Sequence, residues 1–164
     1  MGIKHEDVKA TGDKGYASEW NKNHTIDSDV DFNGYKPINT GTKYYSGAGL
    51  KFEVQEGDFE DFERNEDGTL SIGSASDWRA GIELPDGATI TKCVVTASSN
   101  DGGWYLWRTE IGTTDEGILA QNTLNTEETT ISTPVVDNEN YAYHLSLGAL
   151  SAMTIYNFRI EYTL

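Results

Sequence analysis

The sequence predicts an all-β protein, an antiparallel β-sandwich or jelly roll preceded by an extended N-terminal arm. From residue 50 onward, short segments alternate apolar and polar residues, which is the period of a half-buried strand. Turn-forming residues separate these segments at hairpin-sized intervals, and no stretch keeps the 3.6-residue period of an amphipathic helix. The 164 residues include 17 Gly and nine Tyr, a composition typical of strands and turns.

The individual strands are predicted from local alternation and from the turns that bound them. Leu50, Phe52 and Val54 share one face of the first segment. The Pro-Asp-Gly tripeptide at 85–87 is a turn because Pro fixes φ and Gly accepts positive φ. Asn-Asp-Gly-Gly at 100–103 predicts a tight hairpin. The predicted strands are 50–54, 69–72, 80–84, 88–98, 103–110, 118–120, 129–133, 141–150 and 153–163.

The composition divides the chain into three parts. Residues 1–40 are polar and show neither a helical nor a strand period, so we expect an extended arm for attachment or oligomerisation. Residues 41–49 are rich in Gly, Thr and Ser and are predicted to be a linker. Residues 50–164 are predicted to form the β-sandwich domain.

Charge excludes two classes of partner. The chain carries 12 Lys and Arg against 27 Asp and Glu, which gives a net charge of −15 and a pI near 4.4. Nucleic acids and anionic membranes need clustered positive charge, so we expect no nucleic-acid and no membrane partner. The N-terminus has no apolar leader segment, and no apolar run is long enough to span a bilayer, which predicts synthesis and assembly inside a cell.

We expect no catalytic residue, cofactor or metal. The lone Cys93 excludes an internal disulfide and a cysteine zinc site, and the three histidines lie far apart in the sequence. Residues 29–34 match the first half of a calcium loop, but Thr40 stands where the closing Glu belongs. The acidic segment 56–67 is predicted to be a solvated helical turn or an excursion between strands, with loose cation binding as the alternative.

The tryptophans of the second half are the candidate ligand or interface residues. Trp104 and Trp107 lie three residues apart on one predicted strand, so they face opposite sides and cannot both be in the core. One of them is expected to face solvent, a partner or a ligand, and Trp78 could join it. Exposed aromatic rings stack on sugars or anchor protein interfaces. Aromatic packing within the sheet is the structural alternative.

Two N-terminal segments resemble phage and prophage structural proteins. Residues 18–26 (Ser-Glu-Trp-Asn-Lys-Asn-His-Thr-Ile) are similar to a Ser-Asp-Trp-Asn-x-x-His-x-Ile core common near the N-termini of such proteins, with Glu in place of Asp. Residues 29–39 resemble a repeat of trimeric tail fibres. In the second half, residues 84–90, 136–143 and 159–163 resemble pieces of an all-β module of viral surface proteins.

This resemblance implies a virion structural protein of a tailed phage or archaeal virus. It would be exposed on the particle as a fibre, turret or capsid decoration, assembled in the host cytoplasm, and would contribute to host attachment. Its implied partners are itself, as a homotrimer, other virion proteins such as capsid or tail, and a host surface glycan. The expected attachment residues are Trp20, Asn21, His24, Ile26, Val30, Phe32 and Ile38.

The alternative function is a stand-alone carbohydrate-binding β-sandwich module. In this interpretation Trp104 or Trp107 is the platform on which a sugar ring stacks.

Overall fold

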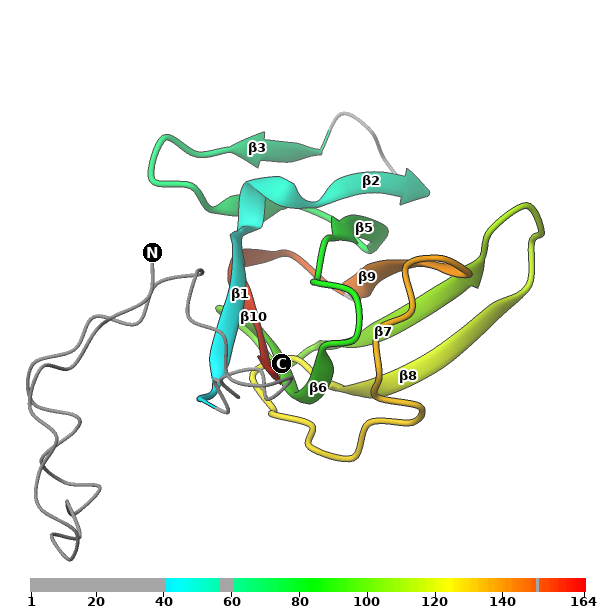
Figure 1. The fold of residues 1–164 in the computed structure, drawn as a ribbon. Helices are drawn as coiled ribbons and strands as arrows, with labels where there is room; N and C mark the ends of the chain where they lie inside the picture. Colours follow the sequence, from blue (N-terminus) through cyan, green and yellow to red (C-terminus); the bar gives the residue numbers. More distant parts are fainter. Residues whose placement is uncertain (1–40, 57–60, 150) are drawn as a thin grey trace, which may run out of the picture. The chain divides into compact units, whose positions relative to one another are not determined.

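The computed structural model describes residues 41–56, 61–149 and 151–164, which form two antiparallel sheets packed face to face (Figure 1). The predicted β-sandwich class is therefore confirmed, while the predicted arm, residues 1–40, lies outside the described residues. Within the described ranges, no helix is long and apolar enough to cross a membrane. The elements are β1 (Lys43–Ala48), η1 (Gly49–Lys51), β2 (Glu53–Glu56), β3 (Phe62–Arg64), β4 (Leu70–Ile72), β5 (Ser76–Ile82), β6 (Thr89–Ala97), β7 (Gly102–Glu110), β8 (Glu116–Thr123), β9 (Tyr141–Ala149) and β10 (Met153–Thr163).

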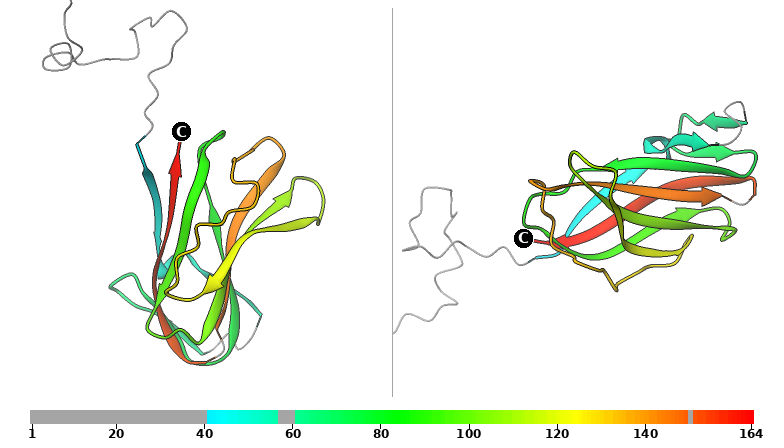
Figure 2. Two further views of the ribbon diagram at one scale, coloured as in Figure 1. Left: turned by 90° about the horizontal axis from the view of Figure 1, so that it is seen from below. Right: turned by 90° about the vertical axis from the view of Figure 1, so that its right-hand side faces the viewer.

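The first sheet, sheet A, is built around the long strand β10. One edge of β10 pairs with β6, and the other pairs with β1 and then with β4, which in turn pairs with β3. The start of β1 lies beside the end of β10 (Figure 2) because Lys43 pairs with Tyr162. Sheet A thus takes its strands from both ends of the described chain.

The second sheet, sheet B, has the strand order β2-β5-β9-β7-β8, and all its pairs are antiparallel. Side chains on its strands alternate between the core and the outer face, most regularly in β5, where every second residue is buried. This alternation leaves one complete face of sheet B pointing away from the core.

Large aromatic side chains fill the space between the two sheets. Trp78, Trp104, Phe52 and Phe158 are fully buried. The ring of Phe158 meets that of Phe52 edge-on with centroids 5.7 Å apart, and Phe62 meets Trp78 in the same way at 5.2 Å. Edge-to-face contacts of this kind add to the hydrophobic stabilisation that burial provides.

The predicted linker, residues 41–49, is wrong over its central part, because residues 43–48 form strand β1. Its glycines serve close packing instead of a flexible connection. A Cβ at Gly47 would overlap the ring of Phe158, and one at Gly49 would overlap the carbonyl oxygen of Ile155. Composition alone does not distinguish these two uses of glycine.

The predicted hairpin at 100–103 is also wrong, since residues 98–101 connect β6 in sheet A to β7 in sheet B, and β7 already begins at Gly102. A Cβ at Gly102 would overlap the carbonyl oxygen of Gly148, so the crossing depends on glycine.

The predicted strand at 129–133 is absent as well. The segment from Glu128 to Val135 instead runs along the edge of β6 and forms isolated bridges with it at Cys93 and Thr89. Cys93 and Glu128 exchange backbone hydrogen bonds of 3.0 and 2.9 Å. This segment shields an edge that would otherwise be open to pairing with another chain.

Strand β10 departs from strict alternation at a β-bulge. Uniform alternation would place Tyr156 on the same face as Phe158. The register against β6 shifts between Ile155 and Asn157, so Ile155 and Phe158 are both buried while Tyr156 is 44% exposed. One extra residue in β10 therefore moves a tyrosine from the core to the surface.

We expect the bulge to determine which aromatic residue of β10 stabilises the fold. Phe158→Ala should lower the free energy of unfolding by about 3–5 kcal/mol, because it leaves a cavity against Phe52. Tyr156→Ala, two residues away, should change it by no more than about 0.5 kcal/mol. Urea unfolding monitored by tryptophan fluorescence gives both values. Equal losses of unfolding free energy in the two variants would contradict the placement of the bulge between Ile155 and Asn157.

Candidate functional site

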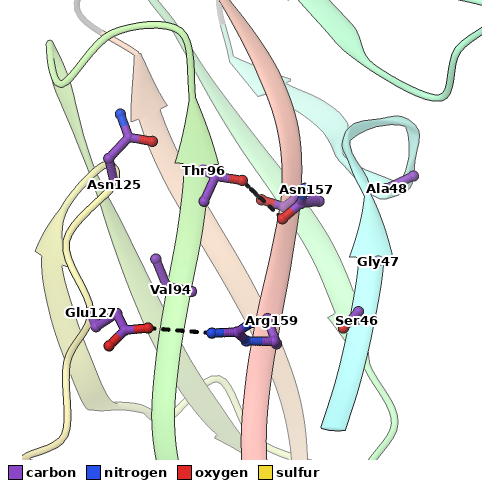
Figure 3. Close-up of a pocket in the computed structure, with 9 residues that line it drawn as sticks. All are labelled: Ser46, Gly47, Ala48, Val94, Thr96, Asn125, Glu127, Asn157 and Arg159. Atoms are coloured by element: carbon purple, nitrogen blue, oxygen red, sulfur yellow. Dashed lines mark hydrogen bonds and ion pairs between the residues drawn. The ribbon is translucent and has the colours of Figure 1, made fainter.

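The outer face of sheet A carries a depression of about 650 Å³ (Figure 3). No aromatic side chain lines it, and four of its polar side chains already bind one another in pairs. Thr96 Oγ1 donates a hydrogen bond of 2.8 Å to Asn157 Oδ1, and the Arg159 guanidinium lies 3.3 Å from a carboxylate oxygen of Glu127. Arg159 also pairs with Glu161 at 3.4 Å. These internal pairs leave little hydrogen-bonding capacity for a ligand.

The outer face of sheet B carries a second depression, which we call the trough, of about 670 Å³. It extends across four neighbouring strands of the sheet. The side chains of Trp78 and Leu147 are buried in the core, so these residues border the trough only through their backbone. The residues that line it are Gln55, Asp77, Trp78, Arg79, Gly103, Tyr105, Trp107, Ser146, Leu147 and Gly148.

Two paired glycines form the floor of the trough. Strand register places Asp77 beside Gly148, and Gly148 beside Gly103, in one row across β5, β9 and β7. A Cβ at Gly148 would lie 3.2 Å from Asp77 Oδ1, and one at Gly103 would lie 3.8 Å from Cε2 of Tyr105. The missing side chains thus leave an open floor between a carboxylate and an aromatic ring.

Tyr105 and Trp107 form the aromatic wall of the trough. They are two residues apart on β7 and share its outer face, with ring centroids 6.1 Å apart and planes inclined by 35°. Trp107 Nε1 donates a hydrogen bond of 2.8 Å to Ser146 Oγ, and its ring lies parallel to that of His144 at 6.2 Å. Contacts from β9 therefore fix the indole before any ligand arrives, which lowers the entropic cost of binding.

Polar side chains stand opposite and beside these rings. Asp77 and Arg79 project outward from β5, and Gln55 lies exposed on β2. Arg79 forms a partly exposed ion pair of 3.7 Å with Glu116 on β8. A few hydrogen-bonding groups around aromatic surface are typical of small-molecule and sugar sites.

The structure separates the three candidate tryptophans. Trp104 and Trp107 lie on opposite faces of β7, as their spacing predicted, and Trp107 is the one that reaches the outer face. The side chains of Trp78 and Trp104 are buried, so neither ring can stack on a ligand or partner, and these two predictions are corrected. The indole nitrogens of both donate hydrogen bonds inside the fold, Trp78 to Ser76 Oγ and Trp104 to the carbonyl of Thr126.

Tyr105 was not among the predicted site residues, although it is 36% exposed. The alternation of β7 places it on the same face as Trp107, and this pattern could have identified it. The expected attachment residues of the arm (Trp20, Asn21, His24, Ile26, Val30, Phe32 and Ile38) lie outside the described residues, as does the partial calcium loop.

The described residues contain neither a reactive thiol nor a metal-binding cluster. Burial raises the pKa of the Cys93 thiol to about 12, so the thiol is protonated and unreactive near neutral pH. In the part of the chain that the structure describes, no group of three or more His, Cys, Asp or Glu side chains could hold a metal ion.

Comparison with known proteins yields distant structural similarity alone. No protein-family profile and no curated protein matches the chain. One similar structure is the C-terminal CBM6 of LamC, a marine laminarinase from Zobellia galactanivorans, with 18% identity over 72% of this chain and 98% of that one, and a TM-score of 0.41. Another is the low-affinity xylan-binding module CBM86 from Roseburia intestinalis, with 10% identity, coverages of 75% and 96%, and a TM-score of 0.43.

A third is the family 11 carbohydrate-binding module of the cellulosomal cellulase Lic26A-Cel5E of Clostridium thermocellum. It has 14% identity over 82% of this chain and 91% of that one, with a TM-score of 0.33. Similarity at this level does not assign a ligand, which must be inferred from the residues of the trough.

His144, which lies beside Trp107 on the neighbouring strand β9, should make stability depend on pH. Its Nε2 is buried without a hydrogen-bond partner among the described residues, and burial, followed by the charge of Arg79, lowers the pKa of its imidazole, against a smaller opposing effect of Glu116. The unfolded chain therefore binds a proton at a higher pH than the folded one, and stability is lost as pH falls below about 6.5.

His144→Phe keeps an aromatic ring against Trp107 and removes this titration. Urea unfolding between pH 7.5 and 5 should show a smaller loss of stability in this variant than in the wild type. His5 and His24 are present in both proteins and cancel in the comparison. Identical pH profiles would contradict the assignment.

Proposed function

We propose that the described domain is a carbohydrate-binding module whose ligand lies in the trough. The observation that carries this proposal is the pair Tyr105 and Trp107, which is held by neighbouring side chains beside an open floor of glycines. A preformed aromatic wall beside an open glycine floor suits a rigid, ring-shaped ligand.

The chemistry of a sugar matches both kinds of surface in the trough. A pyranose ring presents C–H groups on its faces, which pack on aromatic rings, and hydroxyl groups at its rim. Those hydroxyls can donate to the Asp77 carboxylate and accept from the Arg79 guanidinium. The exposed Gln55 amide can do both.

A single-stranded nucleic acid would also stack on aromatic rings, but it needs a positively charged groove. The trough contains one cationic side chain, Arg79, and that side chain is paired with Glu116. The net charge of −15 opposes a polyanion further. Electrostatics thus favours a sugar over a nucleic acid.

The virion interpretation rests on residues 1–40 and on short segments of the domain, and it stays a prediction. The homotrimer, the capsid or tail partners, the location in a virion and the lack of enzymatic activity are likewise predictions. The two functions are compatible, because a particle protein can carry a sugar-binding domain.

The proposal is tested by retardation of the protein in native gels that contain polysaccharides. The panel should include cellulose derivatives, xylan, β-1,3-glucan, mannan, galactan, polygalacturonate and alginate. We expect retardation by at least one of them, and Tyr105→Ala and Trp107→Ala should each weaken it at least about tenfold through loss of stacking. Tyr156→Ala is the control, since it removes a similarly exposed tyrosine from sheet A.

Two glycine variants test the position of the ligand without removing an aromatic ring. Gly103→Leu fills the floor of the trough, whereas Gly81→Leu adds the same side chain to the same face of sheet B, where no atom lies within 4 Å of the new Cβ. The first should abolish retardation and the second should preserve it. Retardation unaffected by Gly103→Leu and by both aromatic variants would refute the proposal.

A further inference from the structure

The side chain of Asp77 lies in the trough. It is exposed on β5, across the glycine floor from Tyr105, and its Oδ1 lies close to Gly148. Among the described residues, no hydrogen bond or ion pair engages its carboxylate, whereas the neighbouring Arg79 is paired with Glu116. The carboxylate is therefore available to a ligand.

The other charges of the trough do not compensate Asp77. Arg79 is the one cation among the lining residues, and its ion pair with Glu116 of 3.7 Å offsets its charge. Asp77, Arg79 and the partner of Arg79, Glu116, together carry one net negative charge, within a chain whose net charge is −15. The field at the floor opposes an anionic ligand and favours groups that donate hydrogen bonds.

Building on the proposed function, we infer that the trough selects uncharged sugar chains and that Asp77 is the residue that enforces this selection. The Asp77 carboxylate accepts hydrogen bonds from hydroxyl groups of a neutral sugar. A uronate or a sulfated sugar places a second negative charge beside the first, in a site with no free cation among its lining residues.

The test compares one polysaccharide in two substituted forms. The neutral polysaccharide that retards the protein most is prepared with carboxymethyl groups and, separately, with uncharged hydroxyethyl groups of comparable size. We expect the carboxymethyl form to bind at least tenfold more weakly than the hydroxyethyl form at low ionic strength, with the difference shrinking in added salt.

Asp77→Asn keeps the shape and an acceptor oxygen but removes the charge. It should weaken binding to the neutral form severalfold and reduce the discrimination against the carboxymethyl form. Glu63→Gln is the matched control, because it removes one charge from an exposed position on β3 in sheet A and should change neither quantity.

The outcomes separate this inference from the proposed function. Equal or tighter binding of the carboxymethyl form, lost in Tyr105→Ala and Trp107→Ala, would overturn the selection of neutral sugars and leave the sugar site standing. Unchanged discrimination in Asp77→Asn would overturn the role of Asp77. If no polysaccharide in the panel is bound through Tyr105 and Trp107, both proposals fail.

Discussion

Two sheets pack on one aromatic core, and this packing decides which side chains reach the outer faces. Because strand residues alternate between faces, each side chain that enters the core sends its neighbours outward. Burial of Trp104 and Leu106 turns Tyr105 and Trp107 to the outer face of sheet B. Burial of Trp78 does the same for Asp77 and Arg79 on β5. The residues of the trough are thus positioned by the core beneath them.

Glycine has two distinct structural uses in this chain. Gly47 and Gly49 let neighbouring elements approach more closely than any side chain would allow. A segment with a linker-like composition therefore packs closely and contains strand β1. Gly103 and Gly148 lie side by side on an outer face, where their missing side chains leave the trough open. The first use supports the core and the second shapes the candidate site.

The sequence predicts much of this fold, because period-two alternation is a local property. The strands at 103–110 and 153–163 were predicted within one residue of β7 and β10, and the spacing of Trp104 and Trp107 correctly placed them on opposite faces. Properties that depend on pairing partners could not be predicted. These include the bulge in β10 and the crossing between sheets at 100–103.

The candidate site depends even more on pairing than the fold does. Asp77 and Gly103 are 26 residues apart in the sequence. They lie in one row of the sheet because each pairs with Gly148 on β9 from opposite sides. No local sequence pattern predicts that these three residues lie side by side. The sequence also does not decide which of the two tryptophans faces outward. In the structure Trp104 packs in the core and Trp107 lies on the outer face.

The most direct test of a sugar site on sheet B is a two-dimensional ¹H–¹⁵N spectrum recorded while an oligomer of the bound polysaccharide is added. The chain has four tryptophans, and the indole N–H groups of the three in the described residues report on different places in the domain. The sugar site predicts a shift of the Trp107 indole, whose N–H binds Ser146, with unchanged signals from the buried indoles of Trp78 and Trp104. Shifts confined to β1, β6 and β10 of sheet A, or no shift at Trp107 under saturating ligand, would contradict it.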